Sequence, residues 1–131
     1  MNLPSQAALA RYGAVKVTTA SPAQVLLMLY DGLLRFLREG QAAMEAKDRA
    51  KVGERIGRAH AILTHLLSTL DFPKNPGLCA QLQALYLFGM RHLLKANIKQ
   101  DPAMLGELVV IFMPLRDAWS TAAAEVAAAG K

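Results

Sequence analysis

The residue types that most often perform chemistry in proteins are sparse and scattered in this sequence. The histidines are His60, His65 and His92. The first two are five residues apart and diverge on a helix, whereas adjacent metal ligands on a helix are three or four apart. The single cysteine, Cys79, has no neighbouring motif that would activate its thiol. With no glycine-rich phosphate loop and no paired Glu-x-x-His sets, we expect no enzyme, no metal and no cofactor.

The basic residues are the next candidates for a binding function. Fifteen Lys and Arg against ten Asp and Glu give a net charge of +5. Two predicted helix faces gather positive charge: Lys51, Arg55 and Arg58 on one, and Arg91, Lys95 and Lys99 on the other. Glu54 interrupts the first face, and aromatic residues that would stack on bases do not interleave with either. A basic helical module that binds nucleic acid or a regulator is therefore the alternative function, not the favoured one.

The length and the cysteine count define the class of protein. The 131 residues fit one domain, and one cysteine excludes an internal disulfide framework. No apolar run approaches the ~20 residues of a membrane span, and the start lacks a signal-peptide core. We expect a cytoplasmic protein without membrane insertion.

Capping signals divide the chain into helices. Ala, Leu, Met, Gln, Glu, Lys and Arg dominate, and strand-like alternation is nearly absent. Ser21-Pro22, Asn75-Pro76 and Asp101-Pro102 each place a cap residue before proline, and Asp48 is a weaker start. Gln24 completes a capping box with Ser21. The predicted helices cover about 22–47, 49–70, 76–99 and 102–128.

Four helices with short connections predict an all-α, antiparallel up-and-down four-helix bundle over residues 21–131. Residues 1–20 are expected to form an N-terminal arm that docks on the bundle. The predicted core stripes are Val25, Leu26, Leu29, Leu33, Phe36 and Leu37; Val52, Ile56, Ala59, Leu63, Leu66 and Leu70; Leu78, Leu82, Leu85, Leu93 and Ala96; and Leu105, Leu108, Phe112, Leu115, Trp119 and Val126.

Three positions within these helices raise local questions. Pro114 removes a backbone hydrogen bond inside the last helix, so a kink is expected there. Gly89 falls on a core stripe, where the missing side chain either admits a neighbouring helix closely or leaves a groove. Asp31 and Arg35 are one turn apart and are expected to pair, and Gly32 would let a neighbouring helix come close.

Two helices have more apolar surface than one core face explains. With ~100° per residue, Leu27 and Leu34 lie about 140 to 160° from the core direction of the first helix, and Tyr30 bridges the faces. In the third helix, a second stripe lies roughly 80 to 160° from the core: Leu87, Met90, Leu94 and Ile98. For that helix, packing against two neighbours is an equal explanation. Otherwise the cover is the arm, a second subunit or an apolar segment of another protein.

Three ordered blocks of sequence resemble the FliS family of flagellar secretion chaperones. The first is Thr19-Ala20-Ser21-Pro22 leading into Leu29-Tyr30-Asp31-Gly32; the second is Leu85-Tyr86, Leu93 and Ala96-Asn97 before Asp101; and the third is Leu115-Arg116-Asp117-Ala118-Trp119. Ser68 to Asp71 and Tyr12 also fit the family pattern, and together the matching residues span 12 to 119.

The resemblance implies a chaperone that binds the disordered C-terminal segment of flagellin in the cytoplasm. It prevents premature polymerisation and assists delivery to the flagellar type III export gate, and homo-oligomerisation stays open. The predicted partner-binding residues are Leu27, Tyr30, Leu34, Leu87, Met90, Leu94, Asn97 and Ile98, and the predicted arm contacts are Tyr12, Val15 and Val17.

Overall fold

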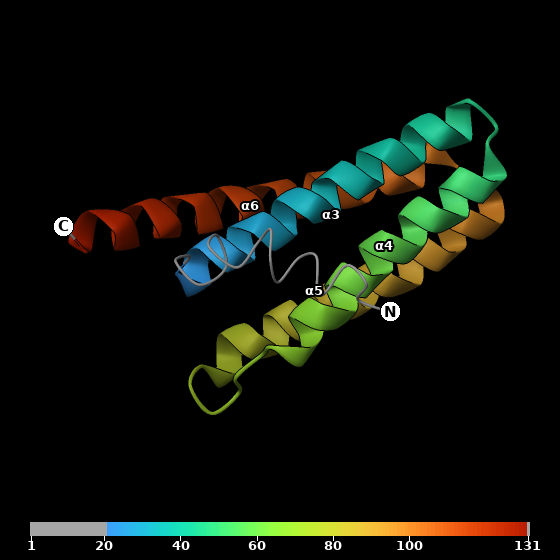
Figure 1. Cartoon of the computed structure of the whole chain (residues 1–131). Coiled ribbons are helices and arrows are strands. Elements are labelled where there is room, and N and C mark those ends of the chain that lie inside the picture. Colours follow the sequence, from blue (N-terminus) through green and yellow to red (C-terminus); the bar gives the residue numbers. More distant parts are fainter. Residues whose placement is uncertain (1–20, 131) are drawn as a thin grey trace, which may run out of the picture.

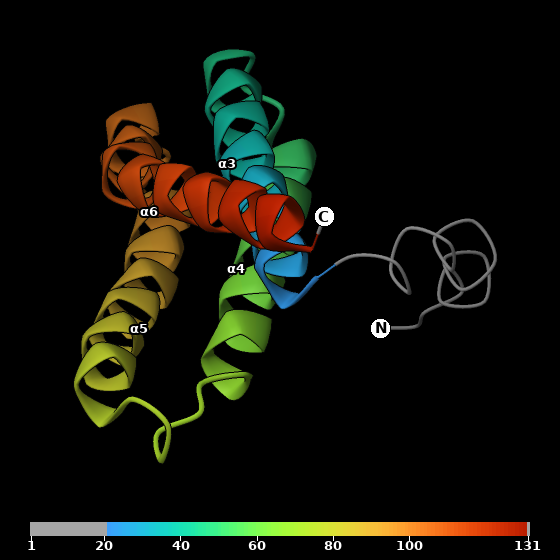
Figure 2. The same ribbon diagram turned by 90° about the vertical axis from the view of Figure 1, so that its left-hand side faces the viewer.

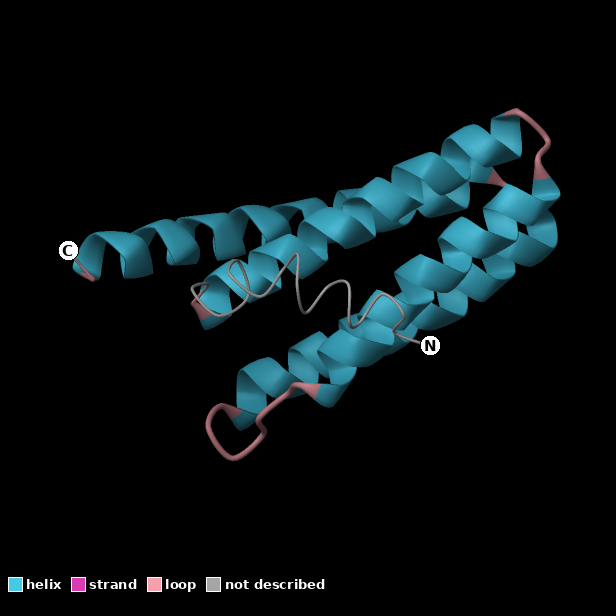
Figure 3. Ribbon diagram, in the orientation of Figure 1, coloured by secondary structure: helices cyan, strands magenta, loops and turns pink. Residues whose placement is uncertain are grey.

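The computed structural model describes residues 21–130, which form four α-helices joined by short loops (Figures 1 and 3). The helices are α3 (Pro22–Glu45), α4 (Arg49–Ser68), α5 (Pro76–Lys99) and α6 (Pro102–Ala129). Their starts are those predicted from the capping residues, and their ends lie within two residues of the predicted ones. The all-α four-helix bundle expected from the sequence is confirmed.

Each helix begins at the predicted cap. The Ser21 hydroxyl accepts from the Gln24 backbone N–H, and the Gln24 side chain accepts from the Ser21 N–H, which completes the capping box. Asp48, Asn75 and Asp101 accept from backbone N–H groups in the first turns of α4, α5 and α6. These side chains satisfy donors that have no partner inside the helix, and so they fix where each helix starts.

The helices alternate in direction, and each packs beside two others. α3 contacts α4 and α6, and α5 contacts the same two helices, so α3 and α5 are diagonally opposite. Figures 1 and 2 show the α3–α6 pair separating from the α4–α5 pair toward the start of α3. Because α3 has a neighbour on each flank, its buried surface must be wide.

One continuous apolar core runs through the bundle. Its largest fully buried side chains are Tyr30, Tyr86, Phe112, Leu33, Leu37, Leu63, Leu66, Leu93, Leu105, Leu108 and Val52. The prediction that Leu78 and Val126 belong to the core is wrong, because these residues are 44% and 49% exposed, respectively. Leu78 lies in the first turn of α5 and Val126 in the last turn of α6, beyond the region that neighbouring helices cover.

Gly89 lies at a point of close approach between three helices. A Cβ atom at this position would be 2.9 Å from Cδ1 of Leu63 on α4 and 3.3 Å from ring atoms of Phe112 on α6. Of the two explanations that the sequence left open, the missing side chain therefore admits its neighbours and leaves no groove. Similarly, Ile62 of α4 approaches Gly32.

Two other local expectations have different outcomes. α6 is helical on both sides of Pro114, and this residue is exposed to solvent. The kink expected at Pro114 stays a prediction. The expected pairing of Asp31 with Arg35 is wrong, because Asp31 accepts from Arg116 Nε of α6 at 2.7 Å. Arg116 replaces the expected partner because the packing of α6 against α3 brings its guanidinium to the Asp31 carboxylate. The Arg35 guanidinium lies over the Phe36 ring instead.

Candidate functional site

The outer face of α5 presents apolar side chains to solvent. The buried residues of this helix recur every three or four positions: Cys79, Leu82, Tyr86, Gly89, Leu93 and Ala96. Leu87 and Leu94 each follow a buried residue by one position, about 100° around the helix, and Ile98 lies farther round. Their exposed fractions are 36%, 53% and 79%, respectively. We call Leu87, Leu94 and Ile98 the α5 face.

Two other predicted residues of this helix are only partly exposed. Met90 packs against the core cluster. The Asn97 backbone carbonyl and side-chain Oδ1 both accept from Gln100 Nε2, at 2.6 and 3.1 Å. Gln100 adopts a left-handed conformation with φ of 51°, which ends the helix. Asn97 therefore takes part in the local structure of the helix end, beside the α5 face.

The expectation that Tyr30 and Leu34 lie on an exposed face of α3 is wrong. Tyr30 is 0% exposed and Leu34 only 3%. The reason is that α3 packs between α4 and α6, so residues far from one core direction face a second neighbour. Neither side chain is accessible to a partner in this conformation of the bundle.

Tyr30 joins a buried polar contact that links the diagonal helices α3 and α5. Its hydroxyl lies 2.6 Å from the hydroxyl of Tyr86. Burial raises the pKa of Tyr30 and, more strongly, the pKa of Tyr86. Phe112 packs edge-on against Tyr30, and the Trp119 ring lies 6.3 Å away. Both hydroxyls thus remain protonated at neutral pH and act as a structural pair.

A second apolar feature lies where α3 begins. A hollow of about 340 Å³ is lined by Pro22, Val25, Leu26 and Leu29 of α3 and by His65 and Thr69. The sequence assigned Val25, Leu26 and Leu29 to the core. The structure leaves all three partly exposed, and Leu26 and Leu29 also pack against the core cluster. Leu27 is also partly exposed, and its partner-binding role stays a prediction. The predicted arm contacts Tyr12, Val15 and Val17 lie outside the described residues.

The basic face of α4 is partly neutralised by carboxylates. Glu54 pairs with Arg55 and Arg58, and Arg55 Nε also lies 2.8 Å from Glu39 Oε1 of α3. The hydrogen bond from Arg58 is the main cause that lowers the pKa of Glu54. Two of the three basic residues of this face, Arg55 and Arg58, are thus already paired with carboxylates.

Other ionisable groups also have structural roles. His92 Nε2 lies 2.7 Å from Glu107 Oε1 on α6, and its ring stacks on Phe88. The free thiol of Cys79 is buried. Within residues 21–130, no group of three His, Cys, Asp or Glu side chains is placed to hold a metal ion. No helix in the same range is long and apolar enough to cross a membrane.

The fold and the α5 face together define the class of protein: a helical bundle that presents one apolar helix face to solvent. Comparison with known proteins then identifies the family. A family model described as "Flagellar protein FliS" matches residues 5–126. The chain belongs to the FliS family.

Named relatives agree with this assignment. The chain is 38% identical to the flagellar secretion chaperone FliS of Bacillus subtilis (strain 168), over 85% of this chain and 82% of the relative. It is 33% identical to the protein of the same name from Vibrio cholerae, over 79% and 76% of the two chains. The corresponding protein of Escherichia coli (strain K12) is 31% identical over 79% and 76%.

Proposed function

We propose that this protein is a cytoplasmic chaperone that binds the disordered C-terminal segment of flagellin, prevents its premature polymerisation and assists its delivery to the flagellar export apparatus. Family membership supports a role in flagellar secretion. The observation that carries the proposal is the α5 face, where Leu94 and Ile98 are more than half exposed. Apolar side chains grouped in this way on a small protein commonly mark a contact surface.

An amphipathic peptide helix that lies along the α5 face would bury its own apolar side chains against Leu87, Leu94 and Ile98. These positions are spaced by seven and four residues, so they form a continuous line over about three helical turns. A disordered segment must offset its ordering cost, which requires it to bury ~1,000 to 3,000 Å². The α5 face supplies only part of that area.

The hollow at the start of α3 would supply a second contact area. Its lining is apolar and it adjoins Ser21, where residues 1–20 join the bundle. We propose that Tyr12, Val15 and Val17 of the arm occupy this area when flagellin is absent, and that the flagellin segment displaces them. Leu27 is partly exposed and directly follows Leu26, which lines the hollow, so we assign it to the same contact.

The direct test is titration of the purified chain with flagellin and with flagellin that lacks its last ~40 residues, a length that can wrap a small bundle. We expect one-to-one binding that tolerates salt and disappears with the truncation. Full binding of the truncated flagellin would contradict the proposal. Steeply salt-dependent binding to nucleic acid would favour the alternative function.

A variant pair tests whether the α5 face is the site. Leu94→Glu should weaken flagellin binding by about 10- to 150-fold, because burying one leucine side chain is worth ~1.5–3 kcal/mol. Val126→Glu is the control, since Val126 is 49% exposed and Leu94 is 53% exposed, but Val126 lies on α6. Equal affinities of the two variants would rule out the α5 face.

A further inference from the structure

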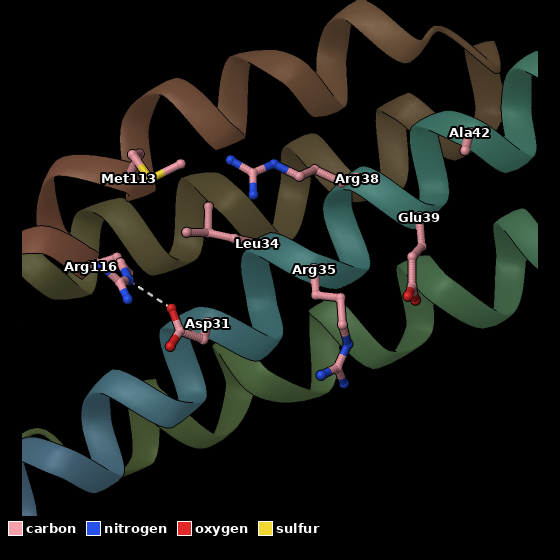
Figure 4. A pocket seen from close by; sticks show the side chains of 8 residues that line it. All are labelled: Asp31, Leu34, Arg35, Arg38, Glu39, Ala42, Met113 and Arg116. Atoms are coloured by element: carbon pink, nitrogen blue, oxygen red, sulfur yellow. Dashed lines mark hydrogen bonds and ion pairs between the residues drawn. The ribbon is translucent and has the colours of Figure 1, made fainter. Parts of the chain in front are cut away.

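A groove with an apolar floor and a basic rim lies between α3 and α6. Its volume is about 470 Å³, within the range of small ligand-binding clefts. Leu34 and Ala42 of α3 and Met113 of α6 contribute its apolar lining (Figure 4). Arg35, Arg38 and Arg116 also line it, and we call it the arginine groove. Among its lining residues, Arg35, Arg38 and Ala42 are exposed, so the groove opens to solvent.

Both carboxylates that line the groove are already paired. Asp31 accepts from Arg116 Nε at 2.7 Å, and Glu39 Oε1 lies 2.8 Å from Arg55 Nε, which reaches it from α4. The ion pair with Asp31 raises the pKa of Arg116. The negative charges of the groove are therefore committed to other arginines.

Two arginines remain without a compensating charge. Within residues 21–130, neither Arg35 nor Arg38 forms an ion pair. The guanidinium of Arg35 lies 4.7 Å from the centre of the Phe36 ring. Figure 4 shows Arg38 extending from α3 in the direction of Met113, whereas Arg35 points the other way. The groove thus offers the Arg38 guanidinium beside Met113 and Ala42, with the buried Leu34 beneath them.

The arm of this chain is a poor match for such a groove. Residues 1–20 contain no Asp or Glu and include Arg11 and Lys16. Like charges at close range repel, so this segment does not complement Arg38. An occupant from another protein, with a carboxylate next to an aliphatic side chain, satisfies both halves of the groove.

We propose that the arginine groove binds an acidic, leucine-containing peptide segment of a protein partner. A Glu or Asp carboxylate accepts two hydrogen bonds from the planar guanidinium of Arg38, and the adjacent aliphatic side chain packs on Met113 and Ala42. The site is separate from the α5 face, because α3 and α5 are diagonally opposite in the bundle. It does not depend on the proposed binding of flagellin along α5.

The test uses a capped, fluorescently labelled peptide of Glu-Leu-Glu-Gly repeats, titrated with the full chain and followed by anisotropy. The matched peptide has Gln in place of Glu. Arg38→Glu should weaken binding of the acidic peptide at least about tenfold, since it removes a charge-assisted pair and adds repulsion. The Gln peptide should bind the unmodified chain no more tightly than the acidic peptide binds the Arg38→Glu variant.

The control variant is Lys95→Glu, which changes the net charge by the same amount on the exposed surface of α5. Its effect should stay below about twofold at physiological salt, because charges beyond a Debye length are screened. Equal losses with Arg38→Glu and Lys95→Glu would show attraction by net charge alone and overturn the proposal. Tighter binding of single-stranded RNA that Arg38→Glu abolishes would overturn it too, in favour of a nucleic-acid groove.

Discussion

Replacing Tyr86 with phenylalanine removes one of the two hydroxyls that meet at the centre of the bundle. In the native chain the hydroxyls lie 2.6 Å apart, and Tyr30 and Tyr86 are 0% and 1% exposed. Tyr86→Phe leaves the Tyr30 hydroxyl buried without this partner. A buried polar group that loses its partner costs about 1–3 kcal/mol, whereas removing both partners together is nearly neutral.

The expected result is therefore an asymmetry between single and double variants. Tyr86→Phe should lower the free energy of unfolding by about 2 kcal/mol, and Tyr30→Phe/Tyr86→Phe should lower it by less than either single variant. With a urea m-value of about 1.5 kcal/mol/M, the single variant's midpoint falls by about 1.3 M. The midpoint is measured by circular dichroism, and the fluorescence of Trp119, the only tryptophan, gives a second probe close to Tyr30.

A double-mutant cycle measures whether the two hydroxyls interact. If the two single losses add up to the loss of the double variant, the hydroxyls do not interact and their proximity has no energetic role. The cycle can also detect whether Trp119 provides a replacement partner for the Tyr30 hydroxyl. Its indole Nε1 is buried and finds no hydrogen-bond partner within residues 21–130. If the freed Tyr30 hydroxyl turns to accept from it, Tyr86→Phe will cost less than Tyr30→Phe.

Two further predictions concern packing and pH. Gly89→Ala should destabilise the bundle by about 1–2 kcal/mol in urea unfolding, because crowding against Leu63 and Phe112 outweighs the gain in helix propensity. The control is Gly53→Ala, which should stabilise the bundle by about 0.4–1 kcal/mol because nothing lies within 4 Å of the added Cβ atom. Stabilisation by both substitutions would contradict the close approach of helices at Gly89. Burial raises the pKa of Tyr30 and Tyr86, so their contribution to stability is complete below about pH 10 and is lost as the pH rises beyond it, when the unfolded tyrosines ionise. Urea midpoints measured between pH 8 and pH 11 should therefore fall more steeply for the native chain than for Tyr30→Phe/Tyr86→Phe. Parallel curves for the two proteins would contradict this prediction.

Local signals in the sequence were sufficient for the helices. Ser21, Asn75 and Asp101 each determine a helix start through hydrogen bonds made within three residues, so no tertiary information is required. The pairing of Asp31 shows the opposite case. Arg35 is its neighbour along the helix, but the contact with Arg116 joins residues 85 positions apart. Such a partner depends on how α6 is seated against α3, which spacing within one helix does not reveal.

The arginine groove was missed for a related reason. Its residues come from α3 and α6, whereas helical spacing along the sequence groups basic residues only within single helices. Arg38 and Arg116 line the same groove only because α3 and α6 pack side by side in this antiparallel register. A signal was available in principle, because Arg35 and Arg38 occupy the polar side of a helix whose other sides are strongly apolar.

The sequences of α3 and α5 both contain more apolar residues than one core face explains, but the structure buries these residues to different extents. In α3, Tyr30 and Leu34 are covered because α6 packs along the side that a single core direction left open. α5 also lies between two neighbours, but Leu94 and Ile98 remain 53% and 79% exposed. Packing within the bundle therefore explains Tyr30 and Leu34 of α3, but not Leu94 and Ile98 of α5. The proposed flagellin contact is therefore assigned to α5, with the partly exposed residues at the start of α3 as a second area.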